Sequence, residues 1–508
     1  MVALVCVGLY LAEERSTAAV AGLPLDDGWI HLQFARNLAG GDGLSYRPGM
    51  PVPGSTAPLW TAILALAFSL PGPLLLWVKL FGGVLYLGGA AVTFALARVL
   101  DVRPGAAGFA ALLFLLTDAM VWSALSGMEI GLFVVLSVGG TAAHLRERRS
   151  GMAARPSLAL VLLGLASLAR PEGLLLLVLA LADRLLLPAP GARRRESARG
   201  VAVGAACALA VVLPAVVFAL YTSGSPLPTT YSVKTDGVRS LLPSGLYLLR
   251  VLGVLFRSHP LPVLLAAAGA VRLLERLGTK QDRGLLPALW TAALPLAYSL
   301  HDSPDAPMMV GNFGRYYFPL FPFVLVLAAV GLDRVLDRLA LADRAWRAAA
   351  AIVLAAVLLV PPVTSLARGS ERYALNVSNV NHSDVAMALW IREHVRPDAL
   401  VAAQDVGAVG FFTPNPLLDL TGIVTPEILP SLEGAAGAPG GRAGLERFLA
   451  ERRPEYLMLF ADSYPGLLES TAAEVLHRIG LERNVTMAGA DLVLARPRWD
   501  GAGAKSSR

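Results

Sequence analysis

Two adjacent carboxylates, Asp26 and Asp27, stand near the start of the chain, directly before a short apolar stretch that begins at Trp29. Their charges repel each other, so at least one of them should bind a proton or a cation more readily than an isolated aspartate. Such a group can accept a proton from an attacking hydroxyl, which is general-base chemistry. An N-cap is the simpler interpretation, because an aspartate before a helix accepts hydrogen bonds from its first amides. Residue type alone favours the cap.

Cationic side chains and a further carboxylate recur where apolar segments end. Arg170, Lys234 and Arg315 each follow or precede an apolar run, at the depth where a lipid phosphate would lie. Negative charge builds on a departing phosphate, and such cations stabilise that charge. Contact with lipid headgroups is the competing interpretation. Glu129, at another such end, could orient a hydroxyl, bind a metal or pair with Arg170.

No metal-binding or redox pattern accompanies these residues. His31, His259 and His301 show no ligand spacing, and Cys6 and Cys207 stand inside apolar runs. The sequence therefore predicts no zinc site, assigns no cofactor, and leaves dependence on a divalent cation open.

The composition indicates what must position these residues. Of the 508 residues, 55% are hydrophobic and only 16% are charged, with a mean hydropathy of +0.60. Soluble proteins carry about 25% charged residues, so an ordinary soluble enzyme, a disordered chain and a coiled coil are disfavoured. The net charge of +6 does not indicate nucleic-acid binding, because the basic residues fall in short loops between apolar runs. We expect a polytopic α-helical membrane protein.

The apolar runs predict about eleven spans, several of them short for a full crossing. They are 1–12, 74–96, 106–121, 130–143, 158–168, 174–187, 201–221, 261–271, 285–300, 317–332 and 348–363. The first is either a partly truncated helix or the core of a cleaved signal peptide, and the retained helix fits the following loop better. Alternate loops are rich in arginine, which predicts that they are cytoplasmic. The loop 13–56 and everything after 363 are then outside.

The composition changes near residue 365. Residues 366–500 hold charged helices, turn-rich links and no membrane-spanning run, which predicts a small extracytoplasmic α/β domain after a membrane module of residues 1–365. The expected strands are 400–403, 409–412, 456–460 and 492–495, and the expected helices are 384–394, 445–451 and 472–478. The tail 501–508 should be disordered.

The motifs around the two aspartates resemble those of a known enzyme family. The first loop reads Asp-Asp-Gly-Trp-Ile from residue 26, Arg-Asn-Leu from 36, Gly-Asp-Gly-Leu from 41 and Gly-Ser-Thr-Ala-Pro-Leu-Trp from 54. Further motifs occupy 126–129, 170–173, 227–234, 314–319 (Gly-Arg-Tyr-Tyr-Phe-Pro), 405–411 and 418–422. Together they cover most of the chain and resemble the GT-C superfamily of membrane glycosyltransferases, in particular the branch with the mycobacterial terminal arabinofuranosyltransferases.

The resemblance implies an inverting glycosyltransferase that moves a sugar from a polyprenyl-phosphate donor to an extracytoplasmic envelope glycan, lipid or protein. Asp26 and Asp27 occupy the place of the first-loop catalytic acid, and Asp27, nearer the following helix, is the better candidate for the base. The same resemblance implies a location in the inner (plasma) membrane. The candidates to bind the donor phosphate or sugar are Arg315, Lys234, Arg170, Glu129 and Tyr316.

Two departures from the relatives leave the sugar and the acceptor open. The relatives usually carry an arginine near Gln33, and a Glu-Gly-Tyr-Thr where this chain has Pro-Gly-Ser-Thr at 53–56.

Two other function classes also remain. A transporter or flippase for a lipid-linked saccharide should show inverted repeats and charges within its spans, and the sequence has no such repeat. A non-catalytic scaffold that binds envelope polymers would make no use of Asp26 and Asp27.

Overall fold

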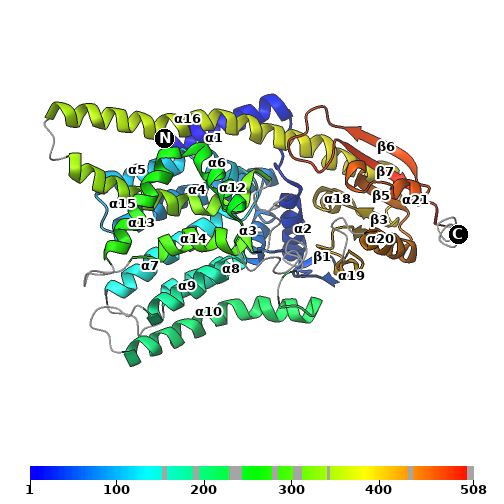
Figure 1. Cartoon of the computed structure of the whole chain (residues 1–508). Coiled ribbons are helices and arrows are strands. Elements are labelled where there is room, and N and C mark those ends of the chain that lie inside the picture. Colours follow the sequence, from blue (N-terminus) through cyan, green and yellow to red (C-terminus); the bar gives the residue numbers. More distant parts are fainter. Residues whose placement is uncertain are drawn as a thin grey trace.

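Long helices and a small β-sheet occupy opposite ends of the molecule (Figure 1). The structure is a computed structural model that describes residues 1–150, 157–186, 194–226, 228, 243–276, 284–300, 312–339, 344–432 and 439–499. Lys234, one of the predicted phosphate-binding residues, and the predicted tail 501–508 lie outside the described residues.

Each apolar run predicted from the sequence is helical over most of its described residues. The helices are α1 (Val2–Ala18), α2 (Asp26–Gly40), α3 (Pro58–Ala67), α4 (Leu74–Val99), α5 (Pro104–Leu115), α6 (Asp118–Leu125), α7 (Ile130–Arg149), α8 (Leu158–Ala169), α9 (Gly173–Leu186), α10 (Arg194–Ser223), α12 (Gly245–Ser258), α13 (Pro260–Glu275), α14 (Leu286–Ser299), η2 (Asn312–Leu320), α15 (Phe321–Leu339) and α16 (Arg344–Val380). A backbone inside a membrane must satisfy its own hydrogen bonds, and a helix does so within one segment.

Four helical segments of the described chain are long and apolar enough to cross a membrane, namely Leu74–Val99, Ala198–Ser223, Gly314–Asp337 and Ile352–His394. Two bent pairs, α5 with α6 (56°) and α12 with α13 (118°), raise this number to six if each pair is one span. Proline begins both α5 and α13, where its missing N–H costs no hydrogen bond. The protein is thus polytopic and helical, and the count of about eleven spans stays a prediction.

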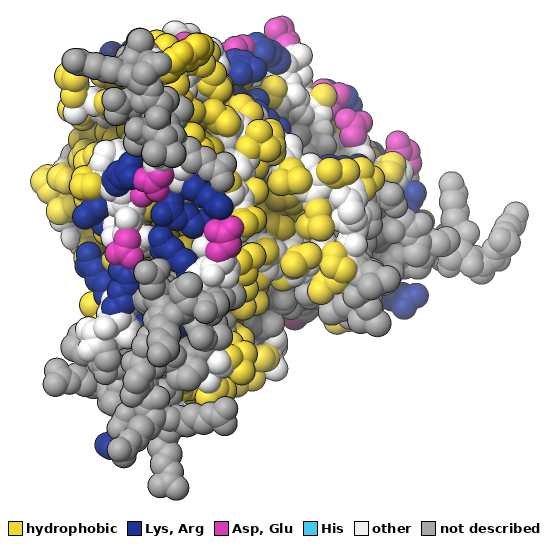
Figure 2. Space-filling model, turned by 60° about the vertical axis from the view of Figure 1, so that its left-hand side comes forward, with side chains coloured by type: hydrophobic (Ala, Val, Ile, Leu, Met, Phe, Trp, Pro, Cys, Tyr) yellow, Lys and Arg dark blue, Asp and Glu magenta, His cyan; other side chains and the backbone are white. Residues whose placement is uncertain are grey.

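Arginine side chains gather at one end of the helical bundle, with hydrophobic side chains around them (Figure 2). Ion pairs join the helix ends there: Arg149 lies 2.9 Å from Asp101, after α4, and Arg334 of α15 lies 3.1 Å from Glu275 of α13. These segments belong to the loops that the sequence predicts to be cytoplasmic.

The sheet has five strands within the described residues, in the order β4-β3-β5-β7-β6. They are β3 (Val401–Ala403), β4 (Leu417–Asp419), β5 (Tyr456–Phe460), β6 (Glu474–Gly480) and β7 (Asp491–Arg496). Strands β4, β3 and β5 are parallel, whereas β7 is antiparallel to both β5 and β6. Helices of the same part are η3 (Asn381–Val385), α17 (Ala386–His394), α18 (Gly407–Phe412), η4 (Pro426–Ile428), α19 (Leu429–Leu432), α20 (Pro439–Arg452), η5 (Ala461–Ser463) and α21 (Leu467–Ser470).

The start of the chain helps to build the core of this α/β part. On one face of the sheet, Leu457 and Leu459 pack with α20. On the other face, Met458 belongs to a cluster that includes Ile30 and Phe34 of α2. The hairpin of β1 (Ser45–Arg47) and β2 (Met50–Pro51) follows α2 in the same loop. The first loop is therefore a structural component of the α/β part.

Two sequence predictions for this part are wrong. Residues 409–412, predicted as a strand from their β-branched and aromatic content, end helix α18, and residues 472–478, predicted as a helix, contain most of strand β6. Strand β6 pairs with β7 along its length, so sheet contacts override its local preference. The predicted domain boundary at 365 falls inside α16, and the first strand of the sheet begins at Val401.

Candidate functional site

Asp26 and Asp27 stand in the first turn of α2, but their carboxylates face different partners. The Asp26 carboxylate accepts hydrogen bonds from the backbone N–H groups of Gly407 at 2.5 Å and Ala408 at 2.7 Å, at the beginning of α18. Such N–H groups have no partner in their own helix, so a carboxylate satisfies them. Glycine suits this close approach, since a Cβ atom at 407 would lie 2.1 Å from the Asp26 carbonyl oxygen. Asp26 therefore joins the first loop to the α/β part.

The other end of α18 is also held by the first loop. Arg36 of α2 donates to the carbonyl of Phe411 at 2.8 Å, where the last carbonyls of α18 lack helical partners. The ring of Trp29 packs on Phe412, with centroids 4.8 Å apart. Side chains of α2 thus position both ends of α18.

Burial raises the pKa of Asp26 to about 7, although its two amide hydrogen bonds favour the ionised form. The nearby charges of Asp27 and Asp419 raise this pKa further. Burial also raises the pKa values of Asp405 and Asp419 above the usual range. Even so, no three His, Cys, Asp or Glu side chains of the described chain are placed to hold a metal ion together.

Asp27 faces the helical part. Its Oδ2 atom lies 2.8 Å from a terminal nitrogen of Arg315, which comes from η2. The Arg315 side chain is 8% exposed, whereas that of Asp27 is 31% exposed. The Asp27 carboxylate is therefore open to a substrate, and Arg315 presents a cation beside it.

Tyr316 lies between two guanidinium groups. The centre of its ring is 5.4 Å from the Arg315 guanidinium and 5.5 Å from that of Arg170, which directly follows α8. An aromatic face attracts cations at this distance. The Tyr316 ring thus contacts both positive charges of the site.

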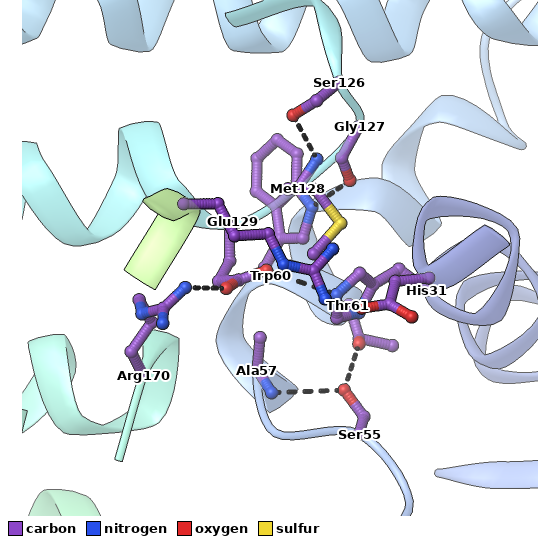
Figure 3. A network of polar contacts seen from close by, with 12 residues as sticks. His31, Ser55, Ala57, Trp60, Thr61, Ser126, Gly127, Met128, Glu129 and Arg170 are labelled. Carbon is purple, nitrogen blue, oxygen red and sulfur yellow. Dashed lines mark hydrogen bonds and ion pairs between the residues drawn. The ribbon is translucent and has the colours of Figure 1, made fainter. Parts of the chain in front are cut away.

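Arg170 and Glu129 form a buried ion pair (Figure 3). One Arg170 nitrogen is 2.6 Å from Oε1 of Glu129, and another is 2.7 Å from Glu172. The second Glu129 oxygen lies 3.3 Å from Nε2 of His31. Burial alone would raise the pKa of Glu129, but the Arg170 guanidinium and His31 hold it below its usual range.

A tight turn places Glu129 at the start of α7. Gly127 has a φ of 72°, a left-handed value that favours glycine, and its carbonyl accepts a hydrogen bond from Nε1 of Trp60 at 2.8 Å. The Ser126 hydroxyl accepts from the Met128 N–H at 3.2 Å (Figure 3). The Ser-Gly-Met-Glu motif therefore fixes the position of Glu129.

These contacts connect six side chains, called the polar ring below. Its members, in order of contact, are Asp27, Arg315, Tyr316, Arg170, Glu129 and His31. The first and last members, Asp27 and His31, are about one helical turn apart on α2. Two carboxylates and two guanidinium groups of this ring can bind hydroxyl groups and a phosphate at once.

The structure brings most of the predicted site residues together. Five of them are in the polar ring, namely Asp27, Arg315, Tyr316, Arg170 and Glu129, and the pairing of Glu129 with Arg170 is one of the arrangements expected from the sequence. Asp26 lies next to the ring but binds α18, and Lys234 is outside the described residues. The roles of all these residues remain predictions.

Sequence reasoning missed His31 and Gly407. The spacing of four residues between Asp27 and His31 on a predicted helix was a usable signal, because such residues share a face. Nothing in the sequence indicated that Gly407 approaches Asp26, 381 residues away.

One family matches part of the sequence. Residues 372–500 match a "Domain of unknown function (DUF8728)", which spans the end of α16 and nearly the whole α/β part. No protein of curated function matches the chain.

Solved structures resemble the whole chain. ArnT from Cupriavidus metallidurans, bound to undecaprenyl phosphate, is 15% identical, covers 97% of both chains and has a TM-score of 0.58. The oligosaccharyltransferase AglB from Archaeoglobus fulgidus, in complex with an inhibitory peptide and a dolichol-phosphate, is 13% identical, with a TM-score of 0.59 over 90% of this chain and 68% of that one. At these identities the likeness concerns the fold.

The mycobacterial arabinofuranosyltransferase AftD is also similar, at 16% identity and a TM-score of 0.48 over 97% of this chain and 41% of that one. A likeness of this strength does not distinguish one branch from another, so the arabinofuranosyltransferase branch stays a prediction.

Proposed function

The chain has the GT-C fold, and from this fold and its polar ring we propose that it transfers a sugar from a polyprenyl-phosphate donor to an extracytoplasmic acceptor of the cell envelope. The observation that carries the proposal is the pairing of Asp27 with Arg315 at 2.8 Å. Asp27 can receive a proton, and Arg315 beside it can stabilise a phosphate.

The reaction uses both groups in one displacement. An acceptor hydroxyl attacks the anomeric carbon of the donor, with Asp27 receiving the hydroxyl proton. A new C–O bond forms while the bond to the phosphate oxygen breaks, and the bonding electrons leave with the polyprenyl phosphate. Arg315 stabilises that charge as it develops. Attack opposite the leaving group inverts the anomeric configuration.

The contacts of Asp26 favour Asp27 as the base. Both Asp26 oxygens accept backbone hydrogen bonds from α18, which ties this carboxylate to the α/β part. Asp26 then positions the first turn of α2, and so Asp27, rather than exchanging protons with the acceptor.

The proposed orientation places the polar ring at the outer surface of the inner membrane. The basic face of the bundle (Figure 2) is then cytoplasmic, in keeping with the excess of arginine in cytoplasmic loops. The α/β part lies at the opposite end (Figure 1), where it would meet an envelope acceptor.

Labelling of single cysteines tests this orientation on the full chain. In a protein with Cys6 and Cys207 replaced by serine, Ser150→Cys should react with an impermeant maleimide only after the cells are opened. Asp398→Cys, in the α/β part, should react on intact spheroplasts. The reverse pattern would place the α/β part in the cytoplasm and overturn the extracytoplasmic acceptor.

The reaction itself is tested with purified protein in detergent. Undecaprenyl-phosphate sugars, offered one at a time with an envelope extract as acceptor, should yield a labelled product with the native protein but not with Asp27→Asn. Mass spectrometry of envelope glycans from cells with and without the protein then identifies the product. Movement of lipid-linked saccharide without a new glycosidic bond would indicate a flippase, and binding of envelope polymer alone would indicate a scaffold.

A further inference from the structure

His31 has one nitrogen with a partner and one without. Nε2 lies 3.3 Å from Glu129, whereas Nδ1 is buried and has no hydrogen-bond partner. The residue is only 5% exposed. Buried polar atoms in folded proteins nearly always have a partner, so an unpaired one beside a candidate site indicates a ligand that completes it.

The partner of Nε2 determines what Nδ1 can do. A lone pair on Nε2 would be repelled by the Glu129 carboxylate, so the tautomer with its proton on Nε2 fits this contact. Nδ1 then presents a lone pair and accepts hydrogen bonds. A hydroxyl group is the complementary donor, and a sugar carries several.

The imidazole cannot easily turn away from this orientation. Glu129 is fixed by Arg170 at 2.6 Å and by the turn at Gly127, whose carbonyl binds Trp60. If the His31 ring rotated, the buried Glu129 oxygen would lose the Nε2–H group that faces it. The structure thus holds Nδ1 ready before any ligand arrives.

We propose that His31 accepts a hydrogen bond from a hydroxyl group of the transferred sugar and so selects the donor. This inference rests on the proposed function, since it takes the sugar phosphate as the ligand of the polar ring. Asp27 is four residues earlier on the same helix, about 6 Å along its axis. A sugar whose anomeric carbon is near Asp27 can therefore extend one hydroxyl toward His31, with its phosphate at Arg315.

Two substitutions separate the two nitrogens. His31→Gln keeps an amide that can donate to Glu129 near the position of Nε2 and removes the acceptor at Nδ1. His31→Asn places an amide oxygen near Nδ1 and gives up the contact with Glu129. The control is His259→Gln, because His259 is also buried, binds Thr117 through Nε2 at 2.7 Å and also has an unpaired Nδ1. It lies at the joint of α12 and α13, outside the polar ring.

The probes are undecaprenyl phosphate, its glycosylated forms and monodeoxy analogues of the form that the native protein prefers. His31→Gln should bind bare undecaprenyl phosphate within about twofold of the native protein, because this ligand has no sugar hydroxyl. Its affinity for the sugar-bearing lipid should fall about 10- to 100-fold, the range expected for one hydrogen bond to a buried partner. It should also lose discrimination against one monodeoxy donor, and His31→Asn should recover part of that discrimination.

Each result decides the proposal. Native discrimination in His31→Gln against every monodeoxy donor would overturn it. Equal loss of bare and sugar-bearing lipid, or the same losses in His259→Gln, would assign His31 a structural role only. If the native protein catalyses no transfer, the binding comparison still applies, and equal affinity for bare and sugar-bearing lipid would overturn the role of His31. A separate measurement shows whether the proposed function fails: Asp27→Asn would then transfer sugar as fast as the native protein.

Discussion

Two clusters of histidine, arginine and carboxylate side chains lie at the two ends of α7, and they contain nearly the same residue types. The polar ring is at its beginning, through Glu129. The other, called the α7–α9 cluster, consists of His144, Glu147, Arg148, Asp183 and Arg184. His144 and Arg148 follow Glu129 by 15 and 19 residues along α7, so about 22–29 Å of helix separate the two clusters.

The clusters differ in their access to solvent. The side chains of His144 and Asp183 are 0% exposed, and that of Arg148 is 3% exposed. In the polar ring the side chain of Asp27 is 31% exposed. Residue types alone therefore do not define a site. A closed cluster fastens helices to one another, whereas a cluster with one reachable carboxylate can meet a substrate.

Asp27→Asn should have the largest effect on activity. The amide is nearly isosteric but cannot receive the acceptor proton, so transfer should fall by about 100- to 10,000-fold. The melting temperature should stay near the native value, because an asparagine can still stand in the first turn of a helix. Transfer is measured with purified protein and the preferred undecaprenyl-phosphate sugar. Undiminished transfer would remove Asp27 as the base and leave it only the ion pair with Arg315.

Asp183→Ala should lower the folding stability and leave sugar transfer nearly unchanged, the reverse of Asp27→Asn. It leaves buried cations of the α7–α9 cluster without their carboxylate, which costs about 3–5 kcal/mol of folding free energy. Thermal unfolding in detergent should show this loss, while transfer per folded molecule at low temperature stays close to native. A native melting temperature together with lost transfer would mean that the α7–α9 cluster takes part in the reaction. The two clusters would then not differ in function.

Arg315→Ala should weaken use of the donor. Loss of a charged hydrogen bond to phosphate lowers affinity by about 10- to 100-fold, which binding of undecaprenyl phosphate can measure. Arg334→Ala is the matched control, since it removes an arginine that pairs with Glu275 near the end of α15 that is farther from η2. If donor binding is unchanged in Arg315→Ala, the phosphate lies elsewhere in the site.

Asp26 should give the smallest effect, a dependence of stability on pH. Its pKa in the folded protein is about 7, above the usual value for an aspartate. Between these values the folded state binds more protons than the unfolded state, so stability rises as pH falls from 7 toward 4 and is lowest above 7. Asp405 and Asp419 add to this trend, because burial raises their pKa values too.

The contribution of Asp26 is isolated by subtraction. Asp26→Asn removes one titrating group, so its melting temperature should change less between pH 5 and pH 8 than that of the native protein, by roughly 1–2 °C. Identical pH profiles would show that Asp26 does not titrate in this interval.

Much of the site could be predicted because its residues lie in short motifs at helix ends. The acids of residues 26 and 27, the Arg-Pro-Glu-Gly after α8 and the Gly-Arg-Tyr-Tyr of η2 each stand where an apolar run begins or ends, so a membrane topology gathers several of them at one surface. The sequence favours Asp27 over Asp26 only by its position, and the contacts that separate the two could not be predicted. They depend on backbone amides that stand 381 and 382 residues away in the chain.

The errors in the α/β part have the same origin. Residues 409–412 are a helix because Asp26 and Arg36 satisfy the two ends of α18, and local propensity contains no information about either contact. Strand β6 is exposed at the edge of the sheet, and its sequence lacks a strong alternation of apolar and polar residues. Only its pairing with β7 defines it as a strand.

The shared core between α2 and the sheet bears on how such proteins can diversify. One buried cluster joins residues of α17, β3 and β5 to four residues of the first loop, namely Ile30, Phe34, Tyr46 and Val52. The α/β part is therefore discontinuous in sequence, because the first loop completes its core. Residues 372–500 alone would expose the apolar surface that the first loop covers. Recombination that exchanges the α/β part between relatives must therefore carry the segment that holds Asp27 along with it, so a new α/β part arrives with its own first loop.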